Sequence, residues 1–139
     1  MAKVNIIYWS GTGNTEQMAN LIAKGALGKG HSVNVMSVSN AKVSHAQEAD
    51  ILVLGSPAMG AEVVEEYEMD PYINEISSLV AGKKVALFGS YGWGGGDFMY
   101  GWIDRMKGYS ANVINNGLIV QYAPEGDDVQ KCIDFGANL

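Results

Sequence analysis

The chain has 139 residues, of which 47% are apolar and 17% charged, and its 15 Asp and Glu against 9 Lys and Arg give a formal charge of −6. This length suits one domain spanning residues 1–139 and falls well short of the about 250 residues of a closed eight-unit α/β barrel. With a pI of about 4.7, the sequence lacks the basic patch that nucleic acids and anionic membranes require, so we expect neither as a partner.

Signals for export or membrane insertion are missing from the sequence. No apolar stretch approaches the about 18 residues of a membrane span, and the first residues show no charged segment leading into an apolar run and a cleavage site. The single cysteine, Cys132, cannot form an internal disulfide bond. We therefore expect a cytoplasmic protein, and we expect it to be a monomer.

Five short apolar segments, rich in Val, Ile and Leu, predict buried β-strands. Continuous apolar runs of this length are typical of parallel strands that are covered on both faces. The strands are expected at residues 4–9, 33–38, 50–55, 84–91 and 113–122.

Apolar residues at helical spacing fill most of the remaining chain. Such patterns begin at Met18, after the Asp70-Pro71 start signal, behind Asp97 and at Val129, whereas residues 39–49 are ambiguous and predict one or two helical turns. Strands that alternate with helices favour right-handed βαβ crossovers. The sequence therefore predicts a doubly wound α/β fold, with a five-stranded parallel sheet and helices on both faces.

Sheets of this class bind ligands beyond the carboxyl ends of their strands, which points to the loops after strands one, three and four. The first of these loops combines glycines, which let the backbone approach an anion, with hydroxyl and amide donors. The helix that follows directs the positive end of its dipole at the same spot. These features indicate a phosphate site made of neutral donors. Its members are Ser10, Gly11, Thr12, Gly13, Asn14 and Thr15.

The common nucleotide motifs do not match this loop. A Walker loop requires Gly-Lys-Ser/Thr, and the loop holds neither Lys nor Arg. The dinucleotide fingerprint requires a third glycine where Glu16 stands, and an acid at the end of the second strand, where residues 37–40 read Ser-Val-Ser-Asn. A phosphate monoester therefore fits better than a nucleoside triphosphate with its metal, and a glycine-rich turn that only caps a helix is the alternative. His31 and His45 lack metal-ligand spacing, so we expect no metal.

The other two loops add aromatic and apolar side chains. Residues 56–62 read Ser-Pro-Ala-Met-Gly-Ala-Glu, and residues 90–94 read Ser-Tyr-Gly-Trp-Gly. An exposed Trp93 among glycines forgoes burial unless a planar ligand stacks on its indole, and Met59 is placed to form the opposite wall. Packing of Trp93 at the base of its loop is the alternative, and we interpret Trp9 and Trp102 as packing residues. Together the three loops predict a ligand that joins an aromatic ring to a phosphate.

Three motifs together resemble those of the short-chain flavodoxins of anaerobic bacteria: Tyr-Trp-Ser-Gly-Thr-Gly-Asn-Thr-Glu at 8–16, Ala-Met-Gly at 58–60 and Phe-Gly-Ser-Tyr-Gly-Trp-Gly at 88–94. The resemblance runs nearly end to end and includes the absence of the insertion in the fifth strand that marks long-chain members. It implies a flavodoxin-like sheet of order 2-1-3-4-5 and one non-covalently bound FMN. It also implies a low-potential one-electron carrier, rather than an enzyme, that works between donor and acceptor oxidoreductases.

The resemblance also implies which residues hold the phosphate. The hydroxyls, the amide side chain and the backbone N–H groups of residues 10–15 would bind it, and Ser90 would add a hydroxyl. In family members that have Ser at the position of Pro57, the serine hydroxyl binds the phosphate. Proline has no hydroxyl, so this contact is not expected here.

For the flavin ring, the resemblance implies stacking between Trp93 and Met59. The Gly92 amide would face the pyrimidine end, Glu62 would accept a hydrogen bond from flavin N3–H, and Gly60 would be the switch that turns its carbonyl toward N5 of the reduced ring. The remaining cofactor contacts are expected from Ser56, Ala58, Ala61, Tyr91 and Gly94.

Acidic residues dominate the chain after the second loop, which holds neither Lys nor Arg from residue 61 to residue 80. Like charges, and burial beside Trp93, disfavour negative charge on the reduced flavin ring. We therefore expect a strongly negative reduction potential for the second one-electron step. The same acids would steer the basic surfaces of redox partner proteins, an effect that fades with salt. A solvated acidic surface without a further role is the alternative. The acids are Glu62, Glu65, Glu66, Glu68 and Asp70.

Other functions use a similar order of elements. A phosphoacceptor receiver domain needs acids at the ends of strands one and three, where this chain has Trp9-Ser10 and Gly55-Ser56. An FMN-dependent reductase of quinones or other small acceptors usually needs a longer chain and a dimer interface to wall its second substrate. That reductase and a redox-silent FMN-binding module stay open as alternatives.

Overall fold

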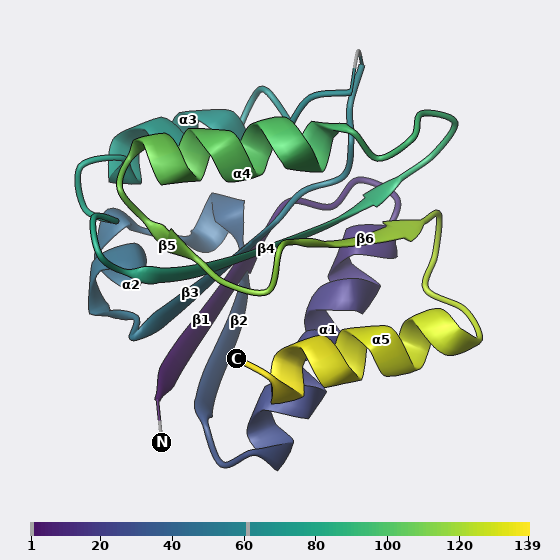
Figure 1. Ribbon diagram of the computed structural model, residues 1–139, viewed down its shortest axis with the longest axis horizontal. Coiled ribbons are helices and arrows are strands. Elements are labelled where there is room, and N and C mark those ends of the chain that lie inside the picture. Colours follow the sequence, from purple (N-terminus) through teal and green to yellow (C-terminus); the bar gives the residue numbers. More distant parts are fainter. Residues whose placement is uncertain (1, 61) are drawn as a thin grey trace.

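A parallel sheet forms the centre of the computed structural model, which describes residues 2–60 and 62–139. The strands follow the order β2-β1-β3-β4-β5, and β6 pairs with β4 on the same side as β5 (Figure 1). The predicted order 2-1-3-4-5 is therefore confirmed. The strands are β1 (Lys3–Tyr8), β2 (Ser32–Ser37), β3 (Ile51–Gly55), β4 (Lys84–Tyr91), β5 (Asn112–Val113) and β6 (Leu118–Gln121).

Helices cover both faces of the sheet, as the sequence predicts (Figure 1). One face packs against α1 (Asn14–Gly28) and α5 (Asp127–Ala137). The other packs against α2 (Val43–Glu48), α3 (Met69–Ile76) and α4 (Phe98–Gly108). The ambiguous stretch before the third strand folds as the short 3₁₀ helix η1 (Val38–Asn40) followed by α2.

Alternating residues of the central strands feed two separate apolar cores. In β3, Leu52 and Leu54 lie in the core that contains Trp102, whereas Ile51 and Val53 lie in the core that contains Met18. A central strand covered on both faces therefore buries consecutive residues, which explains apolar runs such as Ile51 to Leu54. Cys132 of α5 is fully buried in the second of these cores. Burial and the nearby Asp128 raise the pKa of its thiol to about 11.

Two strand predictions were wrong. The expected continuous strand at residues 113–122 is divided into β5 and β6, because Asn115, Asn116 and Gly117 take the left-handed conformation with φ of 65°, 54° and 77°. Asparagine and glycine tolerate that conformation better than other residues do. The second strand is not buried either: it forms an edge of the sheet, and Val35 is 37% exposed.

The carboxyl ends of β1, β3 and β4 meet at one edge of the sheet. Trp9 N–H donates to the carbonyl of Gly55 (3.0 Å), and Ser56 N–H donates to the carbonyl of Phe88 (3.2 Å), so hydrogen bonds continue just past the strand ends. The chain leaves β1 toward the face of α1 and leaves β3 toward the face of α3. This edge is therefore the switch point at which doubly wound sheets bind ligands.

The helices α1 and α5 pack so closely that their backbones are in contact. A Cβ atom on Gly136 would overlap the carbonyl oxygen of Ile22, and one on Gly25 would overlap the carbonyl oxygen of Ile133. Because backbone atoms cannot move aside as a flexible side chain can, only glycine fits at these two positions.

We expect Gly136→Ala to lower the free energy of unfolding by about 1–3 kcal/mol, since the added methyl group must separate the helices. Gly101→Ala is the matched control, because Gly101 lies in the interior of α4 and a Cβ there would meet no atom within 4 Å. That change should be neutral or stabilise the fold by up to about 1 kcal/mol. Urea unfolding measures both, and equal midpoints for Gly136→Ala and the unaltered protein would contradict the close packing.

Candidate functional site

The loop between β1 and α1 is closed by one hydroxyl group. Ser10 Oγ accepts hydrogen bonds from the N–H groups of Gly13 (3.1 Å) and Glu16 (3.3 Å). Gly13 has a φ of 98°, which a residue with a side chain rarely adopts, and α1 begins at the next residue. Ser10 therefore folds the loop back onto the start of the helix.

Five backbone N–H groups in residues 10–15 are left free. Those of Ser10, Gly11, Thr12, Asn14 and Thr15 donate no hydrogen bond within the described parts of the chain, 2–60 and 62–139. Donors at the start of a helix bind anions well, because the helix dipole adds to their positive partial charges. The arrangement can hold a phosphate without any cationic side chain.

A buried pair of hydroxyl groups lies under the loop. Thr15 Oγ1 and Ser90 Oγ are 3.0 Å apart and join the start of α1 to the end of β4, and the two residues are only 1% and 4% exposed. One hydroxyl proton lies in the bond between them, so the second proton is free to point at a ligand. Both residues line the same cavity.

This cavity has a volume of about 290 Å³ and brings most of the predicted residues together. Its polar wall comes from the first loop, and its apolar wall comes from the loops after β3 and β4. The predicted residues that line it are Ser10, Gly11, Thr12, Asn14, Thr15, Ala58, Met59, Ser90, Tyr91 and Gly92. Trp9, Pro57 and Tyr122 complete the lining.

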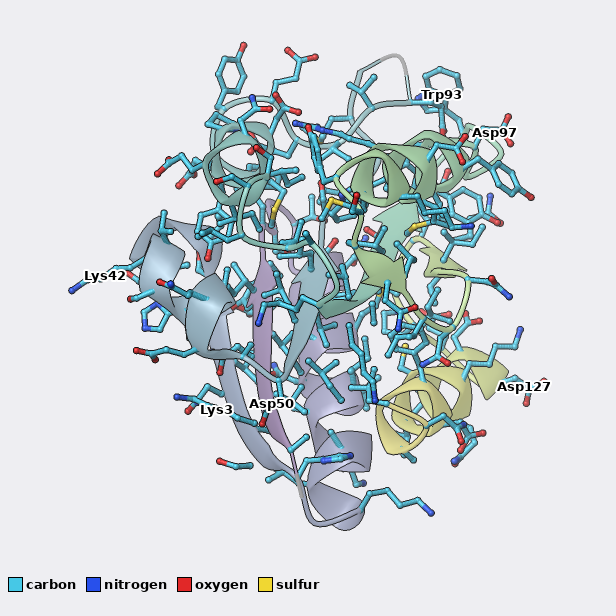
Figure 2. All side chains as sticks on the ribbon, turned by 60° about the vertical axis from the view of Figure 1, so that its left-hand side comes forward. Lys3, Lys42, Asp50, Trp93, Asp97 and Asp127 are labelled. Atoms are coloured by element: carbon cyan, nitrogen blue, oxygen red, sulfur yellow. The ribbon has the colours of Figure 1, made fainter. Side chains whose placement is uncertain are left out.

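A second cavity, of about 180 Å³, shares Ala58 and Gly92 with the first and therefore lies beside it. Trp93 is 86% exposed and packs against little of the protein, unlike an anchor at the base of a loop. Figure 2 shows Trp93 and Asp97 at one end of the molecule, far from Lys3 and Lys42. The residues lining the second cavity are Ala58, Gly60, Glu62, Gly92, Trp93 and Gly94.

The loop after β3 forms a narrow hairpin. The backbones of Met59 and Val63 exchange two hydrogen bonds (2.8 and 3.0 Å), which pair the two arms of the loop. Gly60 and Glu62 have φ of 52° and 60°. Type I and type II turns need a φ of about −60° at the first central position, so a turn with Gly60 at that position is neither of these types. The predicted site residue Ala61 lies outside the described residues.

Glu62 connects this hairpin to the loop after β4. Its Oε2 accepts a hydrogen bond from Phe98 N–H (3.2 Å) at the start of α4. Its Oε1 lies against Gly94, where any Cβ atom would overlap it. Among the described residues, no group donates to Oε1, so this oxygen is free to accept from a ligand.

Two predicted residues lie outside both cavities. Gly13 turns the loop, and its amide is already bonded to Ser10. Ser56 is fully buried, where its hydroxyl donates to the carbonyl of Pro57 (2.9 Å) and accepts from Glu65 N–H (3.0 Å). The structure therefore gives both residues a role in shaping the loops.

Sequence reasoning missed two aromatic residues of the first cavity. The ring of Trp9 packs against the core that contains Trp102, as predicted, but it also lines the cavity, and its indole N–H donates to Glu68 Oε1 (3.1 Å). Tyr122 follows β6, and its N–H donates to the carbonyl of Tyr91 (2.8 Å). An aromatic residue at the end of the fifth predicted strand was a usable signal, because that strand ends at the same edge of the sheet.

The described part of the chain offers neither a cluster of metal ligands nor a membrane-spanning helix. Residues 2–60 and 62–139 contain no group of three His, Cys, Asp or Glu side chains that could hold a metal ion. None of the described helices is both long and apolar enough to cross a membrane.

Known proteins resemble this chain along nearly its whole length. The flavodoxin family model matches residues 6–136. The chain is 52% identical to the flavodoxin of Clostridium beijerinckii over 98% of each chain, and 38% identical to that of Megasphaera elsdenii over 96% of this chain and 95% of the other. The solution structure of two-electron reduced Megasphaera elsdenii flavodoxin matches with a TM-score of 0.87 at 36% identity, over 98% of this chain and 99% of that one. The chain belongs to the flavodoxin family of FMN-binding electron carriers.

Proposed function

We propose that residues 1–139 form one domain that holds FMN across the two cavities, with the phosphate on residues 10–15 and the flavin ring beside Trp93. The observation that carries this placement is the set of free N–H groups above a buried hydroxyl pair, next to an exposed indole. When bound, FMN supplies the capacity to take up and release electrons one at a time. The protein contributes binding, orientation and electrostatics.

The donor set suits the phosphate of FMN. The amides of Gly11, Thr12, Asn14 and Thr15 need an acceptor, and a phosphate monoester offers several strong acceptor oxygens. Hydrogen bonds to a charged group are each worth about 1.5–3 kcal/mol, so a few of them replace the missing Lys or Arg. The free proton of the Thr15 and Ser90 pair adds one more donor.

The second cavity suits the ring. We assign Trp93 and Met59 to its two faces, since both are exposed at the rim, with 86% and 38% of their surface accessible. The Gly92 N–H, which has no partner among residues 2–60 and 62–139, is assigned to the pyrimidine end. Glu62 Oε1 is assigned to flavin N3–H, because Oε2 already receives a hydrogen bond from α4.

Carboxylates near this edge of the sheet support a low reduction potential of the bound cofactor. Positions 43–82 contain neither Lys nor Arg, although they include Glu62, Glu66 and Glu68. Negative charge nearby and a desolvated site both disfavour adding negative charge to the cofactor. We propose that the chain works as a monomeric cytoplasmic carrier rather than an independent enzyme, and that its partner proteins present basic surfaces.

Titration of the apoprotein with FMN tests the placement. We expect one FMN per chain, seen as quenching of flavin fluorescence, and binding of riboflavin that is weaker by about a hundredfold, because riboflavin lacks the phosphate. Equal affinities for the two flavins would contradict the phosphate site. Stepwise reduction should then show two separate one-electron potentials, whereas turnover with NAD(P)H alone would favour the reductase alternative.

Replacing Trp93 tests the ring site. Trp93→Ala should weaken FMN binding by about tenfold, corresponding to about 1.5 kcal/mol of lost stacking, and Trp93→Tyr should retain most of the affinity. Tyr100→Ala is the matched control, because Tyr100 is 71% exposed on α4 and lines neither cavity. Unchanged affinity of Trp93→Ala would place the ring elsewhere.

Salt dependence tests the class of partner. The rate of electron transfer from the reduced protein to a basic cytochrome c should fall roughly tenfold as ionic strength rises from about 0.01 M to about 0.3 M, because screening removes the attraction. Stopped-flow measurement gives this rate. A rate that is independent of salt, or that rises with it, would contradict steering by the acidic surface.

A further inference from the structure

We propose that Glu68 is a positioning residue for the cofactor: it holds the indole of Trp9 against the phosphate loop and thereby strengthens the preference for a phosphorylated flavin. This inference rests on the proposed function, because it takes residues 10–15 as the phosphate site. It concerns two side chains that the motif resemblance leaves without a role.

The ring of Trp9 supports the loop from the side. Its backbone is fixed between β1 and β3 by the hydrogen bond to Gly55, and its ring lines the first cavity. A Cβ atom on Gly11 would lie only 3.0 Å from Cη2 and 3.2 Å from Cζ3 of the indole. The loop backbone therefore rests on the benzene edge of Trp9, and movement of the ring would move the free N–H groups of the loop.

One hydrogen bond from the indole N–H adds to the apolar packing that holds this ring. Nε1, on the edge of the indole away from Cη2 and Cζ3, donates to Glu68 Oε1 at 3.1 Å. An indole N–H can only donate, and among the described residues the Glu68 carboxylate is its acceptor. Within the described ranges, 2–60 and 62–139, the carboxylate of Glu68 accepts from no other group. Glu68 and Gly11 thus contact Trp9 from opposite edges.

Glu68 is itself held by a buried carboxylate. Glu65 is 1% exposed and accepts from the N–H groups of Tyr67 (2.8 Å), Glu68 (2.7 Å) and Met69 (2.9 Å). The N–H of Glu65 in turn donates to Ser56 Oγ, next to the end of β3. This chain of contacts fixes the backbone of Glu68, which reduces the entropy lost when its side chain holds the indole.

The charge of Glu68 makes the proposal easy to test. A carboxylate near a phosphate site repels the ligand, so removal of its charge alone would strengthen FMN binding. Loss of the indole contact would weaken it instead. The two effects have opposite signs, and a glutamine keeps the acceptor oxygen while it removes the charge.

The experiment measures the Kd of the apoprotein for FMN and for riboflavin by fluorescence quenching. We expect Glu68→Ala to raise the Kd for FMN about tenfold and to change the Kd for riboflavin less than about twofold. Glu68→Gln should bind FMN at least as tightly as the unaltered protein. Glu66→Ala is the matched control, because it removes the same charge from an exposed position two residues away, and it should not weaken FMN binding.

A second variant removes the other partner of the hydrogen bond. Trp9→Phe keeps an aromatic ring and loses the N–H, so it should also raise the Kd for FMN more than that for riboflavin. Combined with Glu68→Ala it should be little worse than either change alone. If Glu68→Ala does not fold, as judged by circular dichroism, Trp9→Phe applies the same test.

Three results would overturn the inference. The first is a Kd for FMN that Glu68→Ala leaves unchanged or lowers, and the second is equal weakening for FMN and riboflavin, which would reveal only a general loss of structure. The third is an unaltered protein that binds no FMN, in which case the proposed function fails as well. Tight FMN binding by the unaltered protein together with either of the first two results leaves the proposed function intact.

Discussion

Parallel pairing of β1, β3 and β4 is the constraint on which the site depends, because it brings three strand ends to one edge of the sheet. Hydrogen bonds just past the strands, from Trp9 to Gly55 and from Ser56 to Phe88, keep the following loops together. The buried bond between Thr15 and Ser90 then joins the first helix to β4. The donors of the site are thus positioned before a ligand arrives, which reduces the entropy lost on binding.

The site combines neutral hydrogen-bond donors, which can bind an anion, with nearby carboxylates, which make its surroundings negative. The first loop offers N–H and hydroxyl groups without a full positive charge, so an anion is recognised through directed hydrogen bonds. Carboxylates such as Glu62 and Glu68 lie on the neighbouring segment and make the local electrostatic potential more negative. In the proposed placement, the same edge of the sheet would hold the phosphate of FMN firmly and would still disfavour further negative charge on the flavin ring.

The sequence predicted the sheet order and the helices, because their patterns depend on burial over whole segments. It missed the break at Asn115–Gly117, since an apolar run says little about where single residues turn left-handed. The loops of the site were also predictable, but the separate roles inside them were not. A serine or a tryptophan in such a loop can either contact a ligand or pack within the protein, and the sequence does not distinguish the two. The tertiary structure shows that Ser56 shapes its loop, whereas Trp9 lines the cavity.

The close packing of α1 and α5 at Gly25 and Gly136 affects the order in which the fold is completed. Helix α1 is made early on the ribosome, but the helix that buries one of its sides is α5, about a hundred residues later in the chain. Until α5 has emerged and docked, the later turns of α1, from Ile22 to Ala26, lack their packing partner. The core between α1, α5 and the sheet is therefore completed only after residues 127–137 have been synthesised.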